Sequence, residues 1–279
     1  MTNKPYFIAE IAQAHDGSLG LLHSYIDAVA KTGVQAIKFQ MHIADAESSI
    51  HEPFRIKFSY EDDTRFDYWK RMEFTFEQWK GIKQHCDDVG LDFICSPFSN
   101  AAVDWLQELD VKAYKVGSGE VNNFLLLDKI IQTGKSIIIS SGMSSFDELD
   151  QVVHYLKSQA ANFSILQCTT AYPTLPHQYG LNLITQLKEH YNVPVGFSDH
   201  SAKTATGIAA VALGAEILEF HVVFDRTMFG PDAIASLTIN ETKQLVDGAT
   251  AIYEALSKPI DKNNTTEFAP LKAIFEKSL

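Results

Sequence analysis

The sequence AYKVGSGE, residues 113–120, joins a short apolar run to Lys115, Ser118 and Glu120, all able to take part in chemistry. Seven further runs are built in the same way: FIAE (7–10), AIKFQ (36–40), DFICS (92–96), SIIISS (136–141), SILQCTT (164–170), PVGFSDH (194–200) and ILEFH (217–221). Buried strands need no polar ending for stability, so the repetition indicates a site assembled where strands end. Such a ring is typical of a (β/α)8 barrel, whose active site lies at the carboxyl ends of the strands.

The segments between these runs show the apolar spacing of helices. They cover residues 21–31, 76–89, 101–109, 125–132, 146–156, 183–191, 204–213 and 242–256. This alternation predicts an α/β protein, a (β/α)8 TIM barrel forming a single domain over residues 1–279. An open doubly wound sheet is the alternative. We interpret residues 41–75 as a long βα loop beside the active-site mouth, and residues 257–279 as a C-terminal extension with a helical segment near Leu271.

Composition narrows the class of partner. The chain has 23 Lys and Arg against 35 Asp and Glu, a net charge of -12, which argues against a nucleic acid or an anionic membrane as partner. No stretch reaches the roughly 18 apolar residues of a membrane span, and no signal peptide is recognisable. Three cysteines without a CxxC spacing predict reduced thiols and a cytoplasmic location.

Two histidines end adjacent predicted strands. His200 and His221 could converge on one ion above the barrel, and two imidazoles with open remaining positions suit a catalytic divalent metal. The alternative is a pair of hydrogen-bonded structural histidines. Spacing does not separate these two interpretations.

Two lysines lie inside otherwise apolar runs, where an unpaired cation is costly. Lys38 and Lys115 are therefore expected to face an anion, and phosphate is the natural candidate. Hydroxyl and backbone donors for the same oxygens would come from the serines at 118, 140 and 198 and from the glycine-rich segment 117–119. Ion pairs with Glu10 or Glu120 are one alternative for the lysines, and a lysine Schiff base is another.

Two further motifs are ambiguous between turn and site. The segment DRTMFGPD, residues 225–232, follows the last strand run and brings Asp232 close to His221 in sequence. His15-Asp16-Gly17 follows Glu10 in the same way. Ser96 and Thr170 end strand runs of their own and join the candidates for substrate binding.

Short motifs occur in a fixed order along nearly the whole chain, from residue 7 to about residue 236. They are Ala9-Glu10-Ile11, His15-Asp16-Gly17, Lys38-Phe39-Gln40, Lys115 to Glu120, Ser140-Ser141-Gly142-Met143, Tyr172-Pro173-Thr174, Ser198-Asp199-His200 and Gly230-Pro231-Asp232. In these residues the chain resembles the N-acetylneuraminate (sialic acid) synthase family.

The resemblance implies that phosphoenolpyruvate condenses with an N-acetylmannosamine-like amino sugar, giving a nonulosonic (sialic, legionaminic or pseudaminic) acid and phosphate. His200 and His221 would ligate a divalent ion, preferably Mn2+, with Mg2+ or Co2+ as alternatives. The phosphoenolpyruvate would be held by Lys38, Lys115, Ser118, Ser140 and Ser198, with Ser96 and Thr170 in the same pocket. Glu10 and Glu120 would handle water and protons beside Lys115, and Gln40, Tyr172 and Asp232 would orient the substrates.

Members of this family usually continue into a C-terminal antifreeze-like domain, which donates an arginine to the partner's sugar site in a dimer. The sequence ends before such a domain, which a separate antifreeze-like protein could supply. The resemblance also implies a homodimer. Ala14 and Thr170 stand where the family often has asparagine. Two other functions are consistent with the sequence: a phosphoenolpyruvate-binding barrel subunit without full activity of its own, and a Schiff-base pyruvate aldolase.

Overall fold

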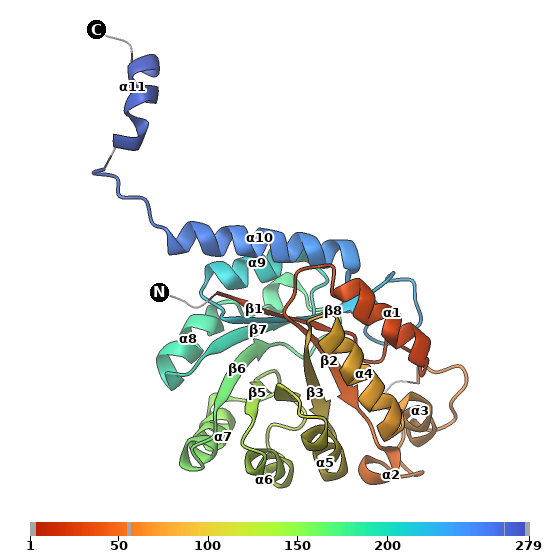
Figure 1. Ribbon diagram of the computed structural model, residues 1–279. Helices are drawn as coiled ribbons and strands as arrows, with labels where there is room; N and C mark the ends of the chain where they lie inside the picture. The colour runs from red at the N-terminus through yellow and green to blue at the C-terminus, as the bar shows by residue number, and fades with distance from the viewer. Residues whose placement is uncertain (1–3, 55–56, 265, 277–279) are drawn as a thin grey trace.

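Eight parallel strands close into a barrel in the computed structural model, which describes residues 4–54, 57–264 and 266–276 (Figure 1). Each strand pairs with the next, and β8 pairs with β1 through Tyr6–Ile217 to Glu10–His221. This closure confirms the (β/α)8 TIM barrel and excludes an open sheet. The strands are β1 (Tyr6–Glu10), β2 (Ala36–Met41), β3 (Asp92–Pro97), β4 (Ala113–Val116), β5 (Ser136–Ser140), β6 (Phe163–Cys168), β7 (Val195–Asp199) and β8 (Ile217–Val223).

A ring of helices surrounds the barrel, and a hydrophobic core fills the space between helices and strands (Figure 1). The helices are α1 (Leu19–Val29), α4 (Phe76–Asp88), α5 (Asn100–Glu108), α6 (Phe124–Gln132), α7 (Phe146–Ser158), α8 (Asn182–Tyr191), α9 (Thr204–Ala212) and α10 (Ile239–Ser257). Short elements η1 (Pro176–Gln178), η2 (Ala233–Ala235) and β9 (Leu237–Thr238) lie in the connections. Every second strand residue points outward into this core, as Phe7, Phe39 and Phe220 do.

The inward-facing residues form two layers. The lower layer is apolar and buried: Ile8, Ala36, Ile94, Ala113, Ile138 and Leu166. The residues two positions further along the same strands are Glu10, Lys38, Ser96, Lys115, Ser140 and Cys168. Because side chains repeat with a period of two along a strand, both sets share the inner face. The barrel therefore has an apolar floor and a polar mouth.

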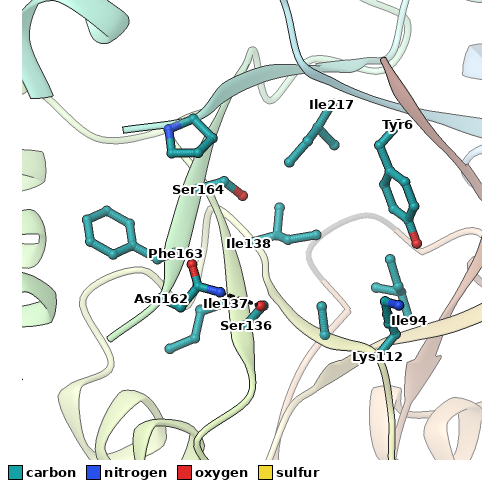
Figure 2. A pocket seen from close by; sticks show the side chains of 12 residues that line it. Tyr6, Ile94, Lys112, Ser136, Ile137, Ile138, Asn162, Phe163, Ser164 and Ile217 are labelled. Carbon is teal, nitrogen blue, oxygen red and sulfur yellow. Dashed lines mark hydrogen bonds between the residues drawn. The ribbon is translucent and has the colours of Figure 1, made fainter. Parts of the chain in front are cut away.

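A cavity of about 250 Å³ opens at the amino ends of the strands, beneath the floor layer (Figure 2). Tyr6, Ser136 and Ile217, which each begin a strand, lie around it. Two of its polar side chains are hydrogen-bonded: Tyr6 Oη donates to Asp92 at 2.7 Å, and Asn162 Nδ2 donates to Ser136 Oγ at 2.8 Å.

The insertion at residues 41–75, expected to be a loop, contains two helices, α2 (Ala44–Glu47) and α3 (Arg65–Met72). Thr64 caps α3 in a reciprocal capping box with Asp67. Arg71 pairs with Asp62 within the insertion (2.8 Å), and its contact with Asp16 (2.5 Å) fastens α3 to the segment that follows β1. A Cβ on Gly17 would collide with the backbone carbonyl of Arg71, so the His15-Asp16-Gly17 motif is a docking turn for the insertion.

The C-terminal extension leaves the barrel after α10. It contains η3 (Thr266–Phe268) and α11 (Ala269–Phe275), which includes Leu271, and it projects away from the barrel (Figure 1). The three cysteines are free thiols, as predicted. Within the described residues, no helix is long and apolar enough to cross a membrane.

Candidate functional site

An inner cavity lies among the polar residues at the carboxyl ends of the strands. It brings together Glu10, Lys38, Gln40, Ser96, Lys115, Ser118, Ser140, Tyr172, Ser198, His200 and His221. All were predicted from sequence, and each of the eight strands, or the connection that follows it, contributes at least one of them. The strand-end ring is thus a single enclosure in three dimensions.

A buried four-charge cluster forms its base. Lys38 Nζ lies 2.7 Å from Glu10 Oε1 and 3.7 Å from Glu219 Oε2, and Lys115 Nζ lies 3.7 Å from Glu219 Oε1. Burial alone would raise the pKa of Glu10, but the charges of Lys38 and His221 outweigh it and hold that pKa below its ordinary value. Both carboxylates and both ammonium groups are almost inaccessible to solvent. The ion pair of Lys38 with Glu10 is the alternative foreseen from sequence, and it coexists with the cavity.

Lys115 is the less neutralised of the two lysines. Its Nζ donates to Ser140 Oγ at 2.6 Å and to the Val116 carbonyl at 3.3 Å, and burial lowers the pKa of its ammonium group. For Lys38, the charges of Glu10 and Glu219 outweigh the effect of burial and raise the pKa. An anion entering the cavity would therefore gain most from Lys115, where positive charge is least compensated.

Serine hydroxyls complete the donors around this cavity. Ser118 Oγ lies 3.2 Å from Cys168 Sγ and accepts from the Gly142 amide at 3.2 Å. Ser198 Oγ donates to Glu219 at 3.1 Å. Hydroxyls on three strand ends beside two ammonium groups form a donor set suited to phosphate oxygens.

The two predicted metal ligands are neighbours, with ring centroids 5.3 Å apart. His200 Nδ1 lies 3.0 Å from the Thr169 carbonyl, which fixes the ring, and its Nε2 lies 3.3 Å from the hydroxyl of Tyr172. Burial, together with the charge of His221, lowers the pKa of His200 to about 3, so its imidazole is neutral at physiological pH. His221 Nε2 lies 3.2 Å from Glu10 Oε2, and its Nδ1 lies 3.8 Å from Asp232 Oδ2.

This donor set fits a divalent ion bound in part by water and substrate. The two imidazoles lie close together, and the carboxyl groups of Glu10 and Asp232 lie beside the ring of His221. Within the described ranges, no group of three or more His, Cys, Asp or Glu side chains is placed so that it could hold a metal ion on its own.

A second, outer cavity of about 450 Å³ adjoins the inner one and shares Gln40, Tyr172 and His221 with it. Asp232 faces this outer cavity, as do side chains of the insertion. The ring of Tyr172 stacks on His200 at 4.2 Å, between the two spaces. Gln40 is fixed in orientation because its Nε2 donates to Glu10 at 2.9 Å while its Oε1 accepts from Gln13 at 3.1 Å.

Two predicted residues lie outside both cavities. β4 ends at Val116, and a turn from Gly117 to Glu120 directs the Glu120 carboxylate to the side-chain amide of Asn123, 2.8 Å away. Thr170 is exposed, and its hydroxyl approaches Gly142 rather than the lysines. Their predicted roles therefore have no support from the geometry.

Glu219 is the main site residue that the sequence interpretation missed. It lies two residues before His221 on β8, and this spacing places both on the inner face. His42 was missed as well: it is buried, its Nδ1 lies 2.6 Å from Glu47, and its Nε2 lies 3.3 Å from Gln40. The aromatic residues of the insertion that face the outer cavity carry no periodic signal that could have identified them.

Fold and site together define a TIM-barrel enzyme with an anion pocket and an adjoining larger cavity at the strand ends. The profile of the NeuB family matches residues 25–261, and the chain belongs to this family. N-acetylneuraminate-9-phosphate synthase of Homo sapiens is 35% identical over 258 residues, covering 91% of this chain and 72% of the human protein. N,N'-diacetyllegionaminic acid synthase of Campylobacter jejuni is 32% identical over 270 residues, covering 95% and 81%.

A solved structure shows the same fold. It is an N-acetylneuraminic acid (sialic acid) synthetase from Leptospira borgpetersenii in complex with citrate, which superposes with a TM-score of 0.84. That protein is 28% identical to this chain, and the match covers 98% of this chain and 93% of the other. The resemblance noted from sequence motifs is thereby confirmed.

Proposed function

We propose that this enzyme condenses phosphoenolpyruvate with an N-acylated amino sugar to give a nonulosonic acid and phosphate. The observation that supports this most is the pair of connected cavities. The inner one presents Lys38, Lys115 and serine hydroxyls, which suit a phosphate ester. The outer one is larger and suits a sugar. Gln40, Tyr172 and His221 line both, at the point where a new carbon–carbon bond would form.

In the proposed reaction, carbon 3 of the enol attacks the aldehyde carbon of the open-chain sugar. Water adds at carbon 2, and the resulting intermediate loses phosphate by cleavage of its C–O bond, leaving the keto acid. Lys115 and Ser140 would hold the phosphate as its charge grows. Glu10 is ionised and in contact with Lys38, Gln40 and His221, so it is placed to accept a proton from the water.

His200 and His221 would hold a divalent ion, for which Mn2+ is our first choice, and such an ion would supply a Lewis acid for the aldehyde oxygen. The neutral imidazole of His200 and the proximity of Glu10 and Asp232 to His221 support this assignment. Tyr172, stacked on His200, would keep the sugar carbonyl close to the two rings.

Phosphate release from phosphoenolpyruvate tests the proposal. The purified chain, with Mn2+ and a panel of N-acylated amino sugars, is expected to release phosphate only when an acceptor is present, and EDTA should abolish the release. A parallel reaction receives an added antifreeze-like domain protein. No turnover under either condition would contradict the proposed function, and turnover only with the added domain would indicate a barrel subunit that needs a partner.

A Schiff-base pyruvate aldolase is the second candidate, because burial lowers the pKa of Lys115 and so favours the nucleophilic amine. Borohydride in the presence of pyruvate would trap a covalent adduct on Lys115 if this mechanism operates. A metal-independent cleavage activity with such an adduct would replace the condensation proposal. We expect no adduct, because Ser140 and Val116 already engage the ammonium group.

We also propose that the enzyme acts in the cytoplasm as a homodimer. Its three free cysteines support a reducing compartment. Light scattering of the purified chain tests the dimer, and a monomer that is fully active would contradict it.

A further inference from the structure

The side-chain amide of Gln40 lies where the two cavities adjoin, and it lines both of them. An amide has two unlike ends, because its oxygen accepts hydrogen bonds and its nitrogen donates them. Rotation by half a turn exchanges these ends with almost no change in shape. A substrate would then meet an acceptor in place of a donor. The chemistry that Gln40 offers to a substrate therefore depends on what holds its amide in one orientation.

Three neighbours of Gln40 favour the same orientation. Its Nε2 donates to Glu10 Oε1 at 2.9 Å, and an ionised carboxylate can only accept. Its Oε1 accepts from Gln13 Nε2 at 3.1 Å and lies 3.3 Å from His42 Nε2. Because an amide oxygen has two lone pairs, these two contacts occupy both. The amide nitrogen gives one of its two hydrogens to Glu10, so the other is what Gln40 can offer to a ligand.

His42 is held in place from three sides. Its ring lies between those of Trp69 and Phe98, at centroid distances of 3.8 and 4.4 Å, and is inclined by 10° to each. Its Nδ1 lies 2.6 Å from Glu47 Oε1, and the residue is buried. The stack fixes the plane of the ring, and the contact with Glu47 fixes which nitrogen faces Gln40. A hydrogen bond at that point requires a proton on Nε2, because Gln40 Oε1 has only lone pairs to offer.

We infer that His42 and Gln13 are positioning residues that together fix the polarity of the Gln40 amide. They keep its nitrogen turned toward Glu10 at the inner cavity and its oxygen turned away. The inference rests on the proposed function, in which Glu10 accepts a proton and a substrate oxygen gains negative charge. A donor beside these groups stabilises them, whereas a carbonyl oxygen in its place would repel them. This role requires no contact between His42 and a substrate.

Two substitutions of His42 separate this role from packing. His42→Gln keeps a donor, because the amide nitrogen of glutamine reaches roughly the position of Nε2, but it loses the ring stack. His42→Phe keeps the stack and loses the donor. We expect His42→Gln to keep kcat/KM for the acceptor within about threefold of the wild type, and His42→Phe to lose about fivefold to tenfold, the cost of one hydrogen bond. Thermal stability should show the opposite order. If His42→Phe is at least as active as His42→Gln, the inference is overturned.

Gln13→Met tests the second donor, because methionine has a similar length and cannot donate a hydrogen bond. We expect kcat/KM for the acceptor to fall about fivefold to tenfold here as well. Gln107→Met is the matched control, since Gln107 is an exposed glutamine on α5, and it should leave kcat and both KM values unchanged. Full activity of Gln13→Met would overturn the positioning role of Gln13.

Stability measurements test the contact between His42 and Gln40 even if the wild type shows no turnover. His42→Phe, Gln40→Met and the double variant form a thermodynamic cycle. A hydrogen bond between the two residues predicts that the double variant loses less stability than the sum of the two single losses. Additive losses would overturn the inference whether or not the enzyme turns over. A coupled cycle without turnover would contradict only the proposed function.

Nitrogen-15 NMR of the His42 ring is the second readout that needs no turnover. The chain has ten histidines, and the signals of His42 are those that disappear in His42→Gln. We expect a proton on Nε2 of His42 in the wild type. A ring protonated only on Nδ1 could not donate to Gln40 and would overturn the inference.

Discussion

The floor and the mouth of this barrel are built from the same strands, one inward-facing residue apart, yet they differ in almost every physical property. Ile8, Ile138 and Leu166 fill the floor with close-packed hydrocarbon. Glu10, Ser140 and Cys168, two positions further along, line a polar cavity. In the cavity beneath the floor, Asn162 donates a hydrogen bond to Ser136 (Figure 2), and Tyr6 donates to Asp92. From this difference we expect the floor to provide stability and the mouth to provide substrate binding.

The largest effect is expected in the mouth, from Lys115→Met. The methionine keeps most of the side-chain volume, but the anion pocket loses its less neutralised ammonium group. We expect kcat/KM for phosphoenolpyruvate to fall by roughly 10²–10³-fold, as when one charge-stabilising donor is lost from a buried site. Phosphate-release kinetics at saturating acceptor measure the change.

A double variant separates this loss from destabilisation. Lys115→Met alone leaves Glu219 with only Lys38 as a charged partner, and breaking a buried pair costs about 3–5 kcal/mol. Adding Glu219→Gln removes the excess charge, so thermal stability should recover while activity does not. Recovery of phosphoenolpyruvate turnover in the double variant would show that Lys115 does not bind the anion.

A matched pair on β5 compares floor and mouth directly. Ile138→Ala leaves a cavity in the floor and should lower the free energy of unfolding by about 2–5 kcal/mol, with an unchanged KM for phosphoenolpyruvate. Ser140→Ala removes the acceptor of Lys115 and should lower kcat/KM by about tenfold, with little effect on stability. Urea unfolding measures the stability of both variants, and steady-state kinetics measure their activity. If each variant loses both stability and activity to a similar extent, the floor and the mouth do not have separate roles.

The barrel and most of its mouth could be predicted from sequence because strand periodicity is simple. Once a run ends in a polar residue, the period of two fixes which neighbours share its face. The same rule identifies Glu219 from His221, because the two are separated by one residue in the run ILEFH. Glu120 lies outside both cavities for a related reason: β4 stops at Val116, and the period of two no longer applies in the turn that follows.

The insertion could not be predicted in the same way. Its two helices are short, and its aromatic residues follow no helical or strand period. Its shape depends on tertiary contacts instead, above all those that Arg71 makes with Asp62 and Asp16. The wall of the outer cavity therefore lies in the part of the mouth that sequence patterns describe least well.

A smaller effect is expected from His42→Phe, which concerns how the mouth is held in position. Phenylalanine can keep the stack between Trp69 (3.8 Å) and Phe98 (4.4 Å), but it loses the contact with Gln40 and the contact with Glu47, whose loss is expected to lower stability rather than activity. We expect kcat/KM for the acceptor to fall about fivefold to tenfold, the cost of one hydrogen bond, because Gln40 is less well oriented toward Glu10. Steady-state kinetics measure it.

The control for this variant is His51→Phe, an exposed histidine of the same insertion. It should leave both KM values and thermal stability unchanged. If His42→Phe affects stability but neither kcat nor KM, His42 has only a packing role and does not position Gln40.

The smallest effect is a pH dependence of the insertion. Hydrogen bonds from Arg71 lower the pKa of Asp62 below its ordinary value, so this ion pair stabilises the insertion at neutral pH. The stabilisation is fully present above the ordinary aspartate pKa of about 3.9 and is lost as the pH falls through the lower folded value. Hydrogen exchange of the α3 amides should therefore accelerate only in acid, while β5 stays protected.

The variant Asp62→Asn tests whether this ion pair is the cause. Exchange in α3 should already be faster at neutral pH and should lose its acid dependence. If exchange in α3 depends on acid equally in both proteins, contacts other than the Asp62–Arg71 ion pair hold the insertion in place. The ion pair then does not explain why the floor is the more rigid region.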